Sequence, residues 1–471
     1  MQHRQLLSNI LVAFFAQGIS LLLSVALSLV VPKLLGVEEF SYWQLFLFYA
    51  SFCGFFHFGL NDGVYLIYGG VPYGNLDYRN IGAQFWVGFI VQAVLSAVFV
   101  LLVMHGSADD GRRFVCMAIA IYMPINNAAF FLGFIFQASN NTKWFSVSIA
   151  ADKLFFLIAI GILLIFDVDF FELFVCFYIL SRCVALGYCA YKGHAVVFAR
   201  PIAVKAAVLE AFSSARVGIT LTLANILGLL ILGAMRFIVD AHWGIEQFGQ
   251  LSLAITVDNF FLVFMQQVSM VLFPALRQGD AHERVSLYAS MSKALAFFMP
   301  IVYALIFPAS MLFELWLPAY TDALSYLLLL LPLCVFESRM SMLGVTYFKV
   351  LRKERRLLLI NGASALMAAV FSLLGAYVFE SIDFIIMSIV LIFVSRSVVA
   401  EVYLTRVLNA CLPSKFFIEL IIVSGIYYLT TYFASPLVAT CVNLASVGVL
   451  VFANRGEMKT LLVKVHSQFL R

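Results

Sequence analysis

In Val31-Pro32-Lys33-Leu34-Leu35-Gly36-Val37-Glu38-Glu39-Phe40-Ser41-Tyr42-Trp43, one apolar run ends at a proline and another begins at an aromatic residue. A glycine and two glutamates form a polar corner between the two runs. The corner recurs 208 residues later, where Gly244-Ile245-Glu246-Gln247-Phe248-Gly249 aligns with Gly36–Ser41. Pro124 and Pro332, inside two further apolar runs, are separated by the same 208 residues. The shared offset indicates an internal repeat.

The composition of the chain is that of a membrane protein. Hydrophobic residues make up 63% of the 471 residues, charged residues make up 11%, and the mean hydropathy is +1.01. Soluble domains average roughly 45–50% apolar and about 25% charged residues. We therefore predict a polytopic membrane protein, in which the net charge of +4 does not indicate nucleic-acid binding.

The apolar runs predict about fourteen transmembrane helices, an all-α fold. The runs do not alternate between polar and apolar residues, and in lipid a helix satisfies its backbone hydrogen bonds within one segment. The first run lacks a small-residue cleavage site and is interpreted as a retained helix rather than a signal peptide. The predicted helices cover 8–31, 40–68, 81–104, 112–137, 146–166, 170–191, 216–239, 247–273, 290–313, 323–348, 357–379, 384–407, 416–433 and 436–453.

Basic residues concentrate on one side of this predicted topology. With a cytoplasmic N-terminus, the cytoplasmic segments contain 20 of the 29 lysines and arginines, and the opposite loops contain 3. Loops rich in lysine and arginine stay in the cytoplasm. Both termini are therefore predicted to be cytoplasmic, with the two repeated corners on the other side.

The repeat predicts two pseudo-symmetric lobes. The 208-residue offset carries predicted helix 1 onto helix 7 and helix 4 onto helix 10. Each lobe then has six helices, an even number, so the repeat is parallel and the transported molecule is expected to pass between the lobes. The predicted divisions are an N-terminal lobe (1–195), a cytoplasmic linker (196–215), a C-terminal lobe (216–407) and a final pair of helices with a tail (408–471).

Several predicted helices carry amides or carboxylates. Such side chains face protein or a water-filled cavity, because facing lipid is costly. For the serine-rich polar face of the first helix, close packing against a neighbouring helix is an equally open interpretation. The amides are Asn9, Gln17, Asn61, Asn259 and Gln266, and the carboxylates are Asp62 and Asp258.

Three arginines, Arg182, Arg339 and Arg396, lie deep within predicted helices. An unpaired guanidinium there is expensive, so two interpretations stay open: a lining of the cargo cavity or a structural ion pair. Glu337 is not expected to pair with Arg339, because residues two apart do not share a helix face. Arg216 begins predicted helix 7 and is either an interfacial anchor or a cavity residue. The excess of cations over carboxylates favours an anionic cargo, since arginine binds two oxygens of a phosphate.

The sequence contains no nucleotide-binding glycine loop, no zinc-spaced His/Glu pair and no nucleophile elbow. Its eight cysteines include no C-x-x-C pair. We therefore predict a protein that is not an enzyme and that has no cofactor, metal site or disulfide framework.

Three short segments together match a pattern found in a known protein family. They are the opening corner, Phe58-Gly59-Leu60-Asn61-Asp62-Gly63 and Leu272-Phe273-Pro274-Ala275-Leu276. With the length, helix number and repeat, they resemble the polysaccharide transporter family (Wzx-type O-antigen and capsule flippases) of the MOP superfamily. That superfamily also contains lipid II flippases and MATE multidrug exporters. The resemblance implies two six-helix lobes around a cationic cavity in the bacterial inner membrane. It also implies flipping of an undecaprenyl-diphosphate-linked oligosaccharide to the periplasmic leaflet, with ion or proton antiport as a candidate driving force.

On this resemblance, the four arginines would bind the diphosphate or acidic sugars, the amides would bind sugar hydroxyls, and one of the two aspartates would carry a coupling proton. The expected partners are the lipid-linked oligosaccharide, membrane lipids and other polysaccharide-assembly proteins. Three alternatives stay open. A MATE-type exporter would place acidic residues deep in its lobes, a lipid II flippase would differ only in cargo, and a polymerase would usually have a long periplasmic loop.

Overall fold

The computed structural model consists of helices and turns, with no strand among the described residues, which confirms the predicted all-α class. Eleven of the described helices are long and apolar enough to cross a membrane, so the chain is a multi-pass membrane protein. The structure describes residues 18–19, 22–104, 109–278, 281–410 and 414–457, without the side chains of 261 and 263–283.

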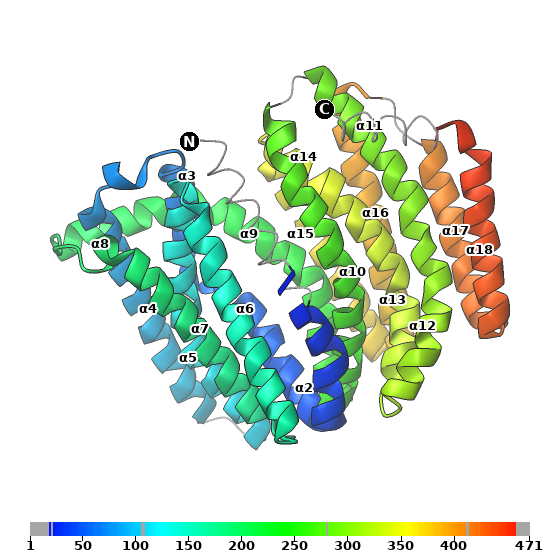
Figure 1. Ribbon diagram of the computed structural model, residues 1–471, viewed down its shortest axis with the longest axis horizontal. Helices are drawn as coiled ribbons and strands as arrows, with labels where there is room; N and C mark the ends of the chain where they lie inside the picture. The colour runs from blue at the N-terminus through cyan, green and yellow to red at the C-terminus, as the bar shows by residue number, and fades with distance from the viewer. Residues whose placement is uncertain (1–17, 20–21, 105–108, 279–280, 411–413, 458–471) are drawn as a thin grey trace. The chain divides into compact units, whose positions relative to one another are not determined.

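The first of two compact units, Met1–Gly233, contains α2 to α8 and most of α9 (Figure 1). Most helix ends lie within a few residues of the predictions, but α9 begins well before the predicted position 216. The bounds are α2 (Val31–Phe52), α3 (Leu60–Ile67), α4 (Tyr78–Met104), α5 (Asp110–Ala138), α6 (Thr142–Ile165), α7 (Phe171–Lys192), α8 (His194–Val197) and α9 (Val204–Trp243).

The second unit, Ala234–Arg471, contains the end of α9 and the helices that follow. Here α10 continues through Pro274, and a 3-10 turn at Met299–Ile301 divides the predicted helix 290–313 at Pro300. The bounds are α10 (Ile245–Gln278), α11 (Ala281–Phe298), α12 (Val302–Trp316), α13 (Thr321–Arg339), α14 (Thr346–Val350), α15 (Glu354–Tyr377), α16 (Ile382–Leu408), α17 (Ser414–Phe433) and α18 (Pro436–Ala453).

Both repeated corners turn at a glycine in the left-handed region of backbone space. Gly36 has a φ of 70° and interrupts α2, whereas Gly244 has a φ of 88° and separates α9 from α10. A side chain would be strained at these angles, which is why glycine fits both positions. The two copies of the corner therefore share a positive φ at the glycine as well as sequence.

The second predicted helix is not continuous. The chain leaves α2 at Phe52 and passes through a 3-10 turn at Cys53–His57 before α3 begins. Phe58 and Gly59 are both left-handed, with φ of 49° and 88°. The prediction of one helix was wrong because residues 40–68 are predominantly apolar on both sides of the break, so hydrophobicity alone does not reveal it. Gly59 is its local signal in the sequence.

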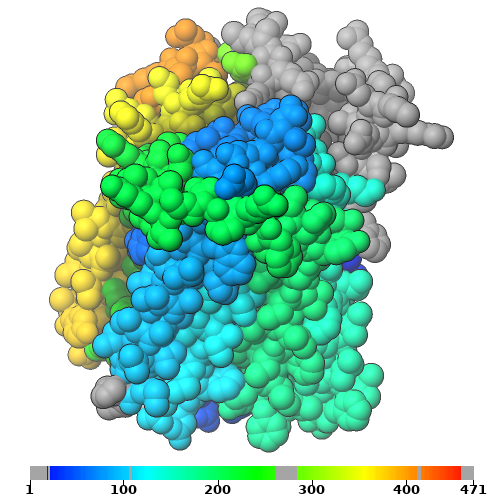
Figure 2. Space-filling model, turned by 90° about the vertical axis from the view of Figure 1, so that its left-hand side faces the viewer, coloured from blue at the N-terminus to red at the C-terminus, as the bar shows by residue number. Residues whose placement is uncertain are grey.

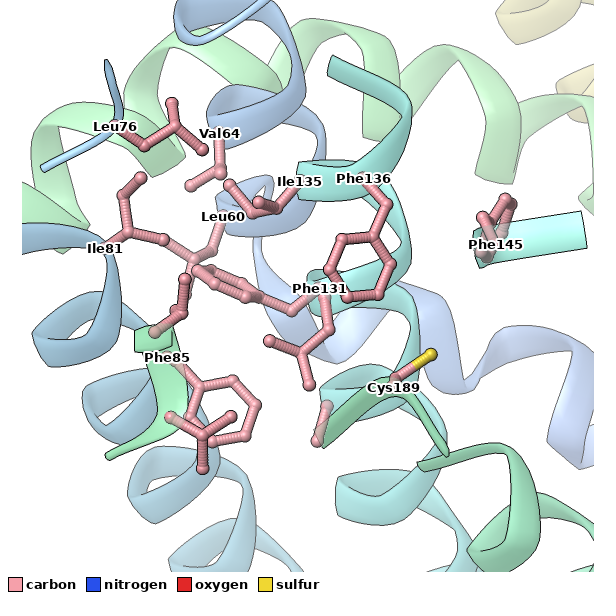
Figure 3. Close-up of a cluster of buried hydrophobic side chains, with 14 of the residues drawn as sticks. Leu60, Val64, Leu76, Ile81, Phe85, Phe131, Ile135, Phe136, Phe145 and Cys189 are labelled. Carbon is pink, nitrogen blue, oxygen red and sulfur yellow. The ribbon is translucent and has the colours of Figure 1, made fainter. Parts of the chain in front are cut away.

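A hydrophobic core holds α3 against α4 and α5, as Figure 3 shows. Leu60 and Val64 of α3 pack with Phe85 of α4, and with Phe131 and Ile135 of α5, and all five are buried. This packing fixes the short helix that follows the break.

On its other side α3 touches the backbone of α9. A Cβ atom on Gly63 would lie 1.8 Å from the carbonyl oxygen of Ser214, and one on Gly218 would lie 2.0 Å from that of Gly59. Glycine permits such an approach because it has no Cβ atom. Ser214 also donates a hydrogen bond of 2.7 Å to Gln84 of α4, so the start of α9 is bound to two helices of the first unit.

The boundary between the units lies inside α9, between Gly233 and Ala234. A linker was predicted at 196–215, and three residues of that segment, Val196, Val197 and Ala211, are buried in the core of the first unit. Figure 1 shows the first half of α9 running obliquely across this bundle, and in Figure 2 its green start lies across the blue helices.

Candidate functional site

A cavity of about 430 Å³ lies within the first unit, bordered by α2, α3, α5, α7 and α9. Amide side chains line it from three of these helices: Asn61 from α3, Asn126 and Asn127 from α5, and Asn225 from α9. Aliphatic side chains, aromatic rings, hydroxyl groups, one carboxylate, one imidazole and one guanidinium complete the lining. This mixture suits a ligand with several polar groups.

An acid and an imidazole meet beside the helix break. Thr222 of α9 donates a short hydrogen bond from its hydroxyl to Asp62 Oδ2, and His57 Nε2 lies 4.0 Å from the same oxygen. His57 Nδ1 accepts a hydrogen bond of 3.0 Å from the backbone amide of Gly59. The side chains of His57 and Asp62 are only 9% and 11% exposed. A histidine and a carboxylate so placed can exchange a proton with a ligand or with water in the cavity.

Two amides tie the broken helix to α5. Asn61 Nδ2 donates to the carbonyl oxygen of Asn127 at 3.0 Å. Asn127 Nδ2 donates at 2.8 Å to Gln92 Oε1 and to the carbonyl oxygen of Cys53. Carbonyls at a helix end lack intrahelical partners, and a buried one needs a substitute. Asn61 therefore lines the cavity and also stabilises the break.

Arg182 of α7 reaches the cavity with an amide and a carboxylate already bound. Its Nε donates to Asn126 Oδ1 and its Nη1 to Asp152 Oδ2, both at 2.8 Å. The ring of Phe130 covers the guanidinium, with its centroid 4.6 Å from Cζ. These two hydrogen bonds use two of five N–H groups, so N–H groups remain for an anionic ligand. We call this arrangement of Arg182, Asn126 and Asp152 a guanidinium clasp.

A second guanidinium clasp lies within the second unit. Arg396 of α16 donates from Nε to Asn361 Oδ1 at 3.0 Å and from Nη1 to Glu337 Oε2 at 2.8 Å. In the first clasp the amide is on α5 and the carboxylate on α6, whereas here the carboxylate is on α13 and the amide on α15. The predicted repeat makes α13 the counterpart of α5 and α15 that of α6. The two polar partners have thus exchanged helices.

Arg339 is enclosed inside the second unit. Its Nε and Nη2 donate to the two carboxylate oxygens of Glu401 at 2.8 and 2.9 Å. Nη1 and Nη2 donate to the carbonyl and hydroxyl oxygens of Ser292, and the ring of Phe417 covers the guanidinium. The Arg339 side chain is 0% exposed. This geometry agrees with the interpretation of Arg339 as one partner of a structural ion pair.

The predicted excess of buried cations is wrong for these three arginines. Each is paired with a carboxylate, and the partners are Asp152, Glu337 and Glu401. The partners lie 30, 59 and 62 positions away in sequence, beyond the helix-face spacings that a sequence reveals. The cavity of the first unit therefore has one compensated guanidinium rather than a strongly cationic wall.

The other predicted site residues whose side chains the structure describes do not line this cavity. Arg216 and Asn259 are exposed on α9 and α10. Asp258 is buried, and its Oδ1 atom has no hydrogen-bond partner in the described part of the chain. The predictions for Asn9 and Gln17 fall outside the described residues, as does the side chain of Gln266.

Two cavity residues on α9, Thr222 and Asn225, were not among the predicted site residues. Their signal in the sequence was the spacing Gly218, Thr222, Asn225, which puts all three on one face of a helix. This face can be assigned to the cavity only after the structure shows that Gly218 touches the helix break.

Neither known protein families nor curated proteins match this sequence. Solved structures do match. The fold is similar to that of the lipid II flippase MurJ in an inward closed conformation, with a TM-score of 0.69 and 12% identity over 96% of this chain and 100% of that one. An inward-facing multidrug resistance MATE family transporter of the MOP superfamily matches with a TM-score of 0.63 and 13% identity, over 84% and 94% of the two chains.

A third similar structure is a MOP superfamily transporter from Pyrococcus furiosus, described as having a binding pocket of reverse polarity. Its TM-score is 0.55 at 14% identity, over 85% of this chain and 94% of that one. The chain therefore has the fold of these MOP superfamily transporters.

Proposed function

We propose that this protein is a flippase that moves an undecaprenyl-diphosphate-linked oligosaccharide from the cytoplasmic to the periplasmic leaflet of the inner membrane by alternating access. The observation that carries the proposal is the chemistry of the cavity in the first unit. Its amides suit sugar hydroxyls, and its guanidinium suits a phosphate. The rings of Phe130 and Phe134 suit the apolar faces of sugars. The fold shared with a lipid II flippase over 96% of this chain supports the same class of cargo.

In this proposal Arg182 binds the diphosphate through its remaining N–H groups while it keeps Asp152. Asn61, Asn126 and Asn225 bind sugar hydroxyls. Because the guanidinium is already compensated, the cargo is held weakly enough to leave, as transport requires. No covalent chemistry is needed, so the protein acts as a transporter rather than an enzyme.

The test is flipping in proteoliposomes that contain an undecaprenyl-diphosphate-linked oligosaccharide. The wild type should expose the sugar to a membrane-impermeant glycosidase on the opposite face. Arg182→Lys should slow flipping by at least about tenfold, because lysine keeps the charge but lacks the planar fork that binds two phosphate oxygens.

Arg396→Lys is the matched control, since it makes the same change in the clasp that does not border this cavity, and it should flip near the wild-type rate. Equal rates for Arg182→Lys and the wild type would contradict the assignment of Arg182. Absence of flipping by the wild type would contradict the function.

A MATE-type cation exporter is the second candidate, because the Asp62 carboxylate lines the same cavity. It predicts that ethidium is transported by the same proteoliposomes, and that Asp62→Asn abolishes this transport whereas Arg182→Lys does not.

A further inference from the structure

We infer that His57 is a proton-binding site that controls the break between α2 and α3. Uptake of a second proton by its ring would release the amide of Gly59 and let this wall of the cavity rearrange. The inference rests on the proposed function, because it names the group that would couple proton movement to transport.

The hydrogen bonds define the protonation state of the ring. His57 Nδ1 accepts from the Gly59 amide at 3.0 Å, so this nitrogen carries no proton. The single proton of a neutral imidazole is then on Nε2, the atom that faces Asp62 Oδ2 at 4.0 Å. A second proton can bind only at Nδ1, and it turns that atom from an acceptor into a donor. The bond to Gly59 is then lost.

That bond holds a strained part of the backbone. Phe58 and Gly59 are consecutive left-handed residues, and Phe58 carries a side chain that disfavours this conformation. On its other side Gly59 is confined by α9, since a Cβ atom there would lie 2.5 Å from the backbone nitrogen of Ile219. Loss of the imidazole acceptor therefore frees the break at the point where it touches α9.

Among the groups around His57, the carboxylate of Asp62 is the one that favours an imidazolium. Asp62 supplies the negative charge that an imidazolium would face. Across the cavity lie Arg182 and Tyr178 of α7 and Tyr122 of α5, and Arg182 is compensated by Asp152. The face of α9 contributes the uncharged Thr222 and Asn225.

Thr222 also links the protonation of His57 to α9. Its hydroxyl is bonded to Asp62, so a change in the pairing of Asp62 with His57 acts directly on this helix. The chain passes from the first unit to the second inside this same helix.

Hydrogen–deuterium exchange of the full-length protein in lipid nanodiscs, without cargo, tests the inference. After correction for intrinsic exchange rates, amides in 53–67 should exchange about tenfold faster at about pH 5.5 than at about pH 7.5, the factor expected for one lost hydrogen bond. His57→Asn keeps an acceptor near the Nδ1 position but does not titrate, so its exchange should not vary with pH. His194→Asn, at an exposed histidine of α8, is the matched control and should behave like the wild type.

Exchange that does not depend on pH in the wild type, or a dependence that persists in His57→Asn, would overturn the inference. If His57→Asn does not fold, Asp62→Asn replaces it. That variant lacks the charge that favours the imidazolium, so it should exchange more slowly than the wild type at about pH 5.5, and equal exchange would overturn the inference. Since no cargo is present, a pH response without flipping would refute the proposed cargo and leave the proton site standing.

Discussion

At the pair formed by Arg339 and Glu401, two charges are withdrawn from solvent and each is compensated by the other. Removal of one partner leaves a buried, unpaired charge, which costs about 3–5 kcal/mol. Glu401→Gln should therefore lower the melting temperature of the purified protein strongly. The double variant Arg339→Met/Glu401→Met should lose less than the sum of its single changes, as followed by tryptophan fluorescence during heating.

Arg216→Gln, at an exposed arginine, is the control for this experiment and should melt like the wild type. A wild-type melting temperature for Glu401→Gln would show that the pair is not essential to the second unit.

Glu39, in the first corner, offers a pH-dependent test outside the membrane-spanning segments. Burial raises the pKa of its carboxyl group, and the nearby Glu172 adds to this, although the Phe171 amide that donates to the carboxylate at 2.9 Å opposes it. A raised folded-state pKa means that the stability contributed by Glu39 is full below its unfolded value of about 4.3 and is lost as the pH rises through the folded value. Glu39→Gln keeps the acceptor without ionising. Its melting temperature relative to the wild type should therefore be higher at pH 7 than at pH 4, and no change in this difference would contradict the assignment.

At the scale of single residues, the sequence predicted which polar positions lie inside the helices but not which residues pair with them. The positions of the deep arginines and of Asn61 and Asp62 could be predicted, because polar groups in apolar runs stand out. Their partners could not be predicted, since Asp152 and Glu401 meet their arginines only after distant helices pack together.

The close crossing of α3 and α9 depends on the absence of a Cβ atom at Gly63 and Gly218. Gly63→Ala would place a Cβ atom 1.8 Å from a backbone oxygen that cannot move aside alone, so the helices must separate. We expect a loss of at least about 1–3 kcal/mol, the usual effect of overpacking, seen as a lower melting temperature or a lower yield. Gly187→Ala in α7 meets nothing within 4 Å and should be neutral or slightly stabilising. Similar effects of the two changes would argue against the close crossing.

A tyrosine of α17 donates the hydrogen bond that a proline in α13 cannot donate. Pro332 has no N–H group to donate to the carbonyl of Leu328, four residues earlier, and Tyr427 of α17 donates to that carbonyl at 2.6 Å instead. Tyr427→Phe should cost about 1 kcal/mol, and Pro332→Ala should relieve that cost by restoring a backbone donor.

Tyr428→Phe is the matched comparison for this double-mutant cycle. Tyr428 donates to Leu329, whose helical donor does not come from Pro332, so Pro332→Ala should not relieve its loss. Equal relief of both tyrosine variants, measured by thermal unfolding, would contradict the role of the tyrosine as a substitute donor.

Helices were predictable where the apolar runs were long and bounded by charges, as at α5 and α15. The break at Gly59 and the early start of α9 at Val204 were not, because both depend on contacts rather than on hydrophobicity. The α9 residues of the cavity, Thr222 and Asn225, lie within the predicted helix 216–239, but their role depends on the contact of Gly218 with the helix break.

For the whole molecule, the parallel repeat inferred from the sequence predicts that both glycine corners lie on the non-cytoplasmic side. Glu38→Cys and Glu246→Cys should both react with a membrane-impermeant maleimide in intact cells. Lys353→Cys, in a predicted cytoplasmic loop, should react only after permeabilisation. Labelling of the two corners from opposite sides would show that the repeat is inverted rather than parallel.

The pairing of the deep arginines has an electrical consequence for the proposed transport. A membrane potential of 100 mV does about 2.3 kcal/mol of work on each uncompensated elementary charge that crosses it. The three pairs without net charge are Arg182–Asp152, Arg339–Glu401 and Arg396–Glu337. Helices that carry these pairs can move through the field without electrical work. Voltage dependence of transport would then measure the charge of the cargo and of any proton bound at His57, not the arginines of the protein.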